Sequence, residues 1–79
     1  MTGENRRPVA AGIVAAAERR VRGELAGRRR RGQRVVTLAG LARATALDPT
    51  TAAGVMRNLE GAECRRMRGE EIRWYLQGR

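Results

Sequence analysis

The sequence predicts a mainly α-helical domain with a small β-sheet, in the order helix, strand, helix, helix, strand, strand. The chain has 79 residues, which is enough for one domain. Three segments carry apolar residues at the spacing of one helix face, and the C-terminal segment alternates apolar and polar residues as a strand does. These observations predict a single α+β domain.

The first helix is predicted to run from Pro8 to about Arg28. Proline suits the first helical position, because the N–H that it lacks would have no partner there. Apolar residues recur at helical spacing at Val9, Ile13, Ala17, Val21 and Leu25. Val14 widens this stripe. We expect residues 1–7 to form a disordered basic arm and residues 8–79 to form the domain.

A short strand and a second helix are predicted next. Val35 and Val36 are β-branched, which favours a strand. Thr37 is a suitable N-cap, because its hydroxyl can accept a hydrogen bond from an unpaired backbone N–H at the helix start. Helical spacing continues through Leu38, Leu41, Ala42 and Leu47. We therefore expect a helix over about 38–46.

A third helix is predicted to begin at Pro49. Asp48 precedes it and can cap the helix, and proline again takes the first helical position. The apolar stripe consists of Ala52, Val55, Met56 and Leu59. The helix is expected to end near Gly61.

Two strands are predicted at the C-terminal end, over residues 64–68 and 71–76. Gly69 lies between them, which indicates a hairpin. The core-facing residues of the last strand are expected to be Ile72, Trp74 and Leu76. Tyr75 has the opposite parity, so we expect it on the other face. Cys64 is interpreted as a small core residue.

The charge of the chain indicates a polyanionic partner. The net charge is +9, and all 17 basic residues are arginine. The isoelectric point is about 11.7, and such basic domains commonly bind nucleic acid. The arginine side chain can bind a phosphate or a guanine edge with two hydrogen bonds. Biased codon usage explains the absence of lysine equally well, but it does not explain the excess of positive charge.

Several classes of function are disfavoured by the composition. The single Cys64 excludes an intrachain disulfide and a multi-cysteine metal site, and the absence of histidine excludes histidine catalysis. The carboxylates form no convincing acid–base pair, so we expect no enzyme activity and no cofactor. No apolar run approaches the ~20 residues of a membrane span, and residues 1–8 lack the apolar core of a signal peptide. We expect a cytoplasmic, nucleoid-associated protein.

Residues 36–76 combine these signals in one pattern. A threonine-capped helix containing Leu-Ala is followed by a short turn, a helix ending in Leu-Glu, and a hairpin. The matching positions are Thr37, Leu41, Ala42, Leu47, Ala52, Met56, Leu59 and Glu60. The pattern resembles the winged helix-turn-helix domain of bacterial and archaeal transcription regulators. The sequence departs from that family at Glu63, where glycine is common, so we expect a different turn into the hairpin.

The resemblance implies that the helix beginning at Pro49 enters the major groove of DNA. Its expected contact residues are Pro49, Thr50, Thr51, Ala53, Gly54 and Arg57. Arg57 is the best candidate for a guanine contact, worth about 1–3 kcal/mol of base discrimination. Glycine inside a helix costs about 1 kcal/mol, and a close approach of DNA at Gly54 would offset this cost. Alternatively, the two threonines only favour the first helical turn, and the small residues pack against a protein.

Further contacts are expected from the hairpin and from the second helix. The candidate hairpin residues are Arg65, Arg66, Arg68 and Arg73. Glu70 and Glu71 at the tip would repel phosphate, and a solvated hairpin with internal Arg–Glu pairs is the alternative. Thr37 and Arg43 are candidate phosphate contacts. Residues 28–31 form either a second phosphate patch or a solvated helix end.

The expected function is that of a small double-stranded-DNA-binding transcription regulator or nucleoid-type protein. Its affinity would be mainly electrostatic, and the first helix would join two copies in a homodimer or cover the domain's own core. Arg6 and Arg7 of the basic arm would reach a groove or stay disordered. The alternatives are a winged-helix module that binds a protein, or one that binds RNA, within a larger replication, transcription or ribosomal assembly.

Overall fold

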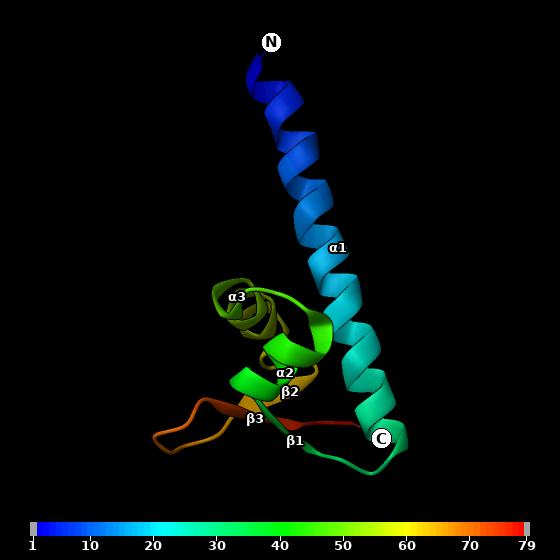
Figure 1. Cartoon of the computed structure of the whole chain (residues 1–79), viewed down its shortest axis with the longest axis vertical. Coiled ribbons are helices and arrows are strands. Elements are labelled where there is room, and N and C mark those ends of the chain that lie inside the picture. Colours follow the sequence, from blue (N-terminus) through cyan, green and yellow to red (C-terminus); the bar gives the residue numbers. More distant parts are fainter. Residues whose placement is uncertain (1, 79) are drawn as a thin grey trace.

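The computed structural model describes the backbone of residues 2–78 and the side chains of residues 14–78. Three helices and a three-stranded antiparallel sheet follow one another in the predicted order, which confirms the α+β class (Figure 1). The elements are α1 (Thr2–Arg30), β1 (Val35–Thr37), α2 (Leu38–Thr45), α3 (Pro49–Leu59), β2 (Cys64–Arg66) and β3 (Arg73–Leu76).

Helix α1 begins at Thr2, whereas the sequence predicted a start at Pro8. The backbone of residues 2–7 is thus helical, which differs from the disordered arm expected there. Once packing anchors a helix, each further residue adds a hydrogen bond at little cost. The helix therefore extends past Pro8, although this proline removes one backbone hydrogen bond. The N-terminal half of α1 extends beyond the rest of the molecule (Figure 1). The side chains of Arg6 and Arg7, and their expected groove contact, lie outside the described residues.

The C-terminal half of α1 supplies one wall of the core. Ala17, Val21 and Leu25 are buried as predicted, against α2 and α3. Val14 is 52% exposed, because it lies at the edge of the contact between α1 and α3. The side chains of the earlier stripe residues lie outside the described part of the chain.

Both predicted helix caps are confirmed. The Thr37 hydroxyl accepts a hydrogen bond from the backbone N–H of Gly40 at 3.0 Å. The Asp48 carboxylate accepts one from the N–H of Thr50 at 3.0 Å. Helix α2 ends at Thr45, and the residue after it, Ala46, adopts the left-handed conformation with φ of 58°. The chain therefore turns sharply from α2 into α3.

The sheet has the strand order β1–β3–β2, so the last strand lies in the middle. Trp74 and Leu76 are buried against the helices as predicted, and Cys64 is buried beside them. The Trp74 indole N–H donates to a Glu60 carboxylate oxygen at 2.7 Å, which ties the sheet to the end of α3.

The two hairpin strands are shorter than predicted. Strand β2 ends at Arg66 and β3 begins at Arg73, so the loop between them is longer. Ile72 was expected in the core but is 36% exposed. Its carbonyl accepts a hydrogen bond from the N–H of Leu38 at 2.9 Å, one position beyond Thr37 and Arg73, the last pair of β1 and β3. Alternation along the sequence did not reveal where the strand begins.

Candidate nucleic-acid interface

Helix α3 presents the polar face that the sequence predicted. Its buried side is Ala52, Val55, Met56 and Leu59. On the other side, Pro49, Thr50, Thr51 and Arg57 are exposed, while Ala53 and Gly54 are half-buried. Asn58 is also exposed on this side, and the sequence analysis missed it. Its spacing of four residues from Gly54 was the available signal, because residues at that spacing share a helix face.

The structure brings the start of α2, the start of α3 and the hairpin together on one surface. A depression of about 410 Å³ is lined by Leu38 and by the α3 residues Pro49, Thr50, Ala53, Gly54 and Arg57. A second depression of about 280 Å³ is lined by Leu38, Ala39, Pro49, Glu71 and Ile72. The two share Leu38 and Pro49, so the surface is continuous. We call it the α3–hairpin surface.

Gly54 has no structural reason to be glycine within the domain. A Cβ atom built at this position would meet no atom within 4 Å. Its backbone is helical and lacks a positive φ, unlike that of Gly61 and Gly69. Neither packing nor turn geometry therefore explains a residue that weakens the helix by about 1 kcal/mol.

Helix N-termini on this surface offer few unpaired donors. Thr37 is half-buried, and its hydroxyl accepts from Gly40, while the N–H of Leu38 bonds to the hairpin. The carboxylate of Asp48 occupies the N-terminus of α3 and is exposed. Its negative charge opposes phosphate binding at this point, so basic side chains must supply most of the attraction.

Basic side chains of α2, α3 and the hairpin are mostly free of partners among the described residues. Arg43, Arg57, Arg66 and Arg68 are exposed and make no side-chain hydrogen bond or ion pair within the described residues. Arg73 is half-buried and donates to the backbone carbonyl of residue 68 at 3.3 Å. The sequence analysis offered a hairpin with internal Arg–Glu pairs as an alternative. No such pair forms among the described side chains of the hairpin.

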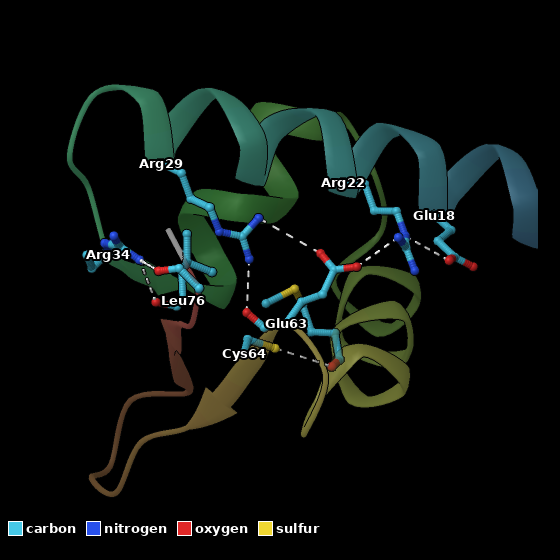
Figure 2. A network of polar contacts seen from close by, with 9 residues as sticks. Glu18, Arg22, Arg29, Arg34, Glu63, Cys64 and Leu76 are labelled. Atoms are coloured by element: carbon cyan, nitrogen blue, oxygen red, sulfur yellow. Dashed lines mark hydrogen bonds and ion pairs between the residues drawn. The ribbon is translucent and has the colours of Figure 1, made fainter.

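The arginines of α1 have different surroundings, which Figure 2 shows. Glu63, just before β2, pairs with Arg22 at 2.8 Å and lies 3.9 Å from Arg29. Arg29 also donates to the Glu63 backbone carbonyl at 2.9 Å, and Glu18 pairs with Arg22 at 2.9 Å. Gly61, with φ of +91°, makes the preceding turn. Glu63 therefore forms an acidic clasp between α1 and the hairpin.

The charge run over residues 28–31 is divided between two environments. Arg28 pairs with Glu24 at 2.8 Å, and the next arginine belongs to the clasp described above. Arg30 and Arg31 are exposed and make no side-chain contact of this kind within the described residues. Only Arg30 and Arg31 of this run therefore remain as candidate phosphate contacts.

Two other arginines bond to backbone carbonyls, and the sequence analysis missed both. Arg20 donates to the carbonyl of Thr45 at 3.4 Å, which links α1 to the end of α2. Arg34 donates to the carbonyls of Leu76 and Gly78 at 3.3 Å and 2.6 Å (Figure 2). These contacts stabilise the fold, because they join residues far apart in the sequence.

Cys64 is a core residue, as predicted. Its side chain is buried, and its Sγ atom lies 3.8 Å from the carbonyl oxygen of Met56. Burial raises the pKa of the thiol to about 11, with further contributions from Glu60 and Glu63 and an opposing one from Arg29. The thiol is therefore protonated at neutral pH and a poor nucleophile. The described residues contain no cluster of three metal-ligating side chains.

Comparison with known proteins identified no relative of this chain. No protein-family model matches the chain, and neither curated proteins nor solved structures show a significant match to it. Within residues 2–78, no helix has the length and apolar character needed to cross a membrane.

Proposed function

We propose that this protein binds double-stranded DNA through the α3–hairpin surface, as a small transcription regulator or nucleoid-type protein. The observation that carries the proposal is the distribution of arginine contacts. Arg43, Arg57, Arg66 and Arg68 on α2, α3 and the hairpin are exposed and make no side-chain hydrogen bond or ion pair within the described residues, and the outward residues of α3 are mostly small. Unneutralised guanidinium groups on α3 and on the elements around it are suited to a phosphate backbone and a groove.

Helix α3 is the element that would enter the major groove. Thr50 and Gly54 lie on its outward face and allow the backbone of the helix to approach the DNA closely. Arg57 and Asn58 follow on the same side of the helix. Arginine pairs with a guanine edge and asparagine with an adenine edge in bidentate fashion. These two residues are therefore the proposed source of any sequence preference.

The hairpin would contact the phosphate backbone beside the groove. Arg66 and Arg68 supply positive charge there, while Glu70 and Glu71 near the tip oppose it. This mixture of charges predicts moderate affinity with a strong dependence on salt, because each neutralised phosphate releases bound cations.

A second copy of the chain would bind through α1. The N-terminal half of this helix extends past the rest of the molecule (Figure 1). Val14 lies at the edge of the contact between α1 and α3 and is 52% exposed. A twofold dimer would place two copies of α3 about one helical turn of DNA apart, roughly 34 Å. Sedimentation of the protein with and without a duplex would measure this stoichiometry.

The test is a titration of labelled random-sequence duplex DNA at several salt concentrations, with matched duplex RNA as a second arm. We expect log affinity for DNA to fall linearly with log salt concentration. The double variant Arg66→Ala/Arg68→Ala should make that slope shallower by about 2, one unit for each lost phosphate contact.

The matched control is Arg19→Ala/Arg30→Ala, which removes the same charge from exposed positions of α1. We expect it to leave the slope nearly unchanged. An affinity that is independent of salt, or no binding to any duplex, would contradict the proposal. Tighter binding to duplex RNA would change the assigned ligand. A co-purifying protein that buries α3 would favour a protein-interaction module.

A further inference from the structure

The outer face of the sheet carries residues that are not part of the α3–hairpin surface. Strand alternation directs Val36, Trp74 and Leu76 into the core. The intervening residues therefore face away from the helices. Across the three strands, Val35, Tyr75 and Arg65 form one row, because Tyr75 is the register partner of both other residues. We call this row and Arg73, which has the same parity as Tyr75, the outer sheet face.

An exposed aromatic ring lies at the centre of this face. Tyr75 is 38% exposed and Val35 is 43% exposed, although both are large apolar side chains. The guanidinium carbon of Arg65 lies 5.9 Å from the centroid of the Tyr75 ring, within the range of a cation–π contact. Tyr75 on the middle strand β3 therefore presents a planar ring, and Arg65 on the neighbouring strand β2 places a planar cation over it.

The charge of this face is positive only. Its basic residues are Arg65 and Arg73, and the three strands contain no acidic residue. The guanidinium of Arg73 donates to the carbonyl of Arg68 at 3.3 Å, and its Nε atom is buried without a hydrogen-bond partner among the described residues. A second copy of the chain on this face would bring arginines against arginines, which is unfavourable. A polyanion that also carries planar apolar rings is complementary to it.

We propose that the outer sheet face binds single-stranded nucleic acid, with one unpaired base stacked on Tyr75 and Arg65. Proteins bind single strands by combining aromatic stacking platforms with positive charge along the backbone. Val35 extends the apolar contact on one side of the ring, and Arg73 lies on the same strand for an adjacent phosphate. The face is directed away from α3 (Figure 1), so this site is separate from the proposed duplex site.

The test compares Tyr75→Ala and Tyr75→Phe with the unchanged protein. Fluorescence anisotropy would measure the affinity for a labelled oligothymidine, an oligouridine and a duplex at one salt concentration. Stacking of one base predicts about a 10-fold loss of single-strand affinity in Tyr75→Ala. Tyr75→Phe keeps the ring and should stay close to the unchanged protein. Arg57→Ala should lower duplex affinity and leave single-strand affinity unchanged, which separates the two sites.

Crosslinking gives a direct readout of the stacked base. An oligonucleotide with 5-iodouracil should crosslink to Tyr75 on irradiation, and peptide mass spectrometry would locate the adduct. Fluorescence of the buried Trp74 reports whether each variant is folded. No single-strand binding, an equal loss for duplex and single strands in Tyr75→Ala, or a crosslink confined to other residues would overturn the proposal. A dimer that Tyr75→Ala converts to monomers would do the same.

Discussion

The arginines of α1 and those of the α3–hairpin surface belong to the same basic chain but have different partners. On α1, Arg22 and Arg29 are held by Glu63, and Arg28 is held by Glu24. On the other surface, Arg43 and Arg57 project from the helices without side-chain partners in the described residues. The net charge of the chain does not distinguish these two groups of arginines. Their surroundings show that some arginines hold the fold together, whereas others remain available to a ligand.

The difference follows from where the carboxylates lie. Glu18 and Glu24 are one helical turn before Arg22 and Arg28, so these pairs form on the surface of α1 itself. Helices α2 and α3 contain no acidic residue between Leu38 and Leu59 apart from Asp48, which caps α3. Within the described residues, the carboxylates that pair with arginines are those of Glu18, Glu24 and Glu63, and all of their arginine partners lie on α1.

The largest expected effect comes from breaking the clasp between α1 and the hairpin. Arg29→Ala removes a charged hydrogen bond and leaves a half-buried Glu63 with one partner fewer. We expect the free energy of unfolding to fall by about 2 kcal/mol, measured by urea denaturation. The neighbouring Arg30→Ala is the control and should change it by less than about 0.5 kcal/mol. Equal effects of the two substitutions would remove the distinction between the two arginine groups.

The second effect concerns the other group of arginines. Arg57→Ala should leave stability nearly unchanged and weaken binding to a preferred duplex by about 2 kcal/mol, roughly 30-fold. Selection from a random duplex pool would supply that preferred sequence, and anisotropy would measure the affinity. Arg19→Ala removes an exposed charge from α1 and should have little effect. A larger loss of affinity in Arg19→Ala than in Arg57→Ala would place the interface elsewhere.

The third effect separates stability from binding at one position. Leucine is a better helix former than glycine, and open space surrounds Gly54. Gly54→Leu should therefore raise the free energy of unfolding by up to about 1 kcal/mol. The same side chain should hinder the approach of α3 to DNA and lower duplex affinity. A folded Gly54→Leu variant with full affinity would show that α3 does not approach the duplex at this residue.

The smallest effect is expected for the exposed ion pair between Glu18 and Arg22 on α1. Glu18→Gln breaks a surface pair with Arg22 within one helix, and such pairs contribute about 0.3–0.5 kcal/mol. Glu63→Gln weakens contacts between distant segments and should destabilise the protein more. Thermal denaturation of the two variants under the same conditions gives the comparison. The interpretation of Glu63 as a clasp requires its substitution to have the larger effect.

The local signals in the sequence were sufficient for most of the fold. Thr37 and Asp48 cap their helices because a capping bond depends on residues within a few positions of one another. The parity of Trp74 and Tyr75 followed from strand alternation alone. The outward face of α3 could be derived from helical spacing, although Asn58 was overlooked.

The tertiary structure decided the features that depend on residues far apart in the chain. Arg29 and Glu63 meet across 34 positions, so no local pattern could show which arginines are neutralised. The start of β3, and with it the exposure of Ile72, depends on pairing across the hairpin and on a bond to the start of α2. The sequence by itself determined the helices, their caps and the excess of positive charge. Folding alone determined which of those charges remain free to bind, because that depends on the neighbours that packing brings together.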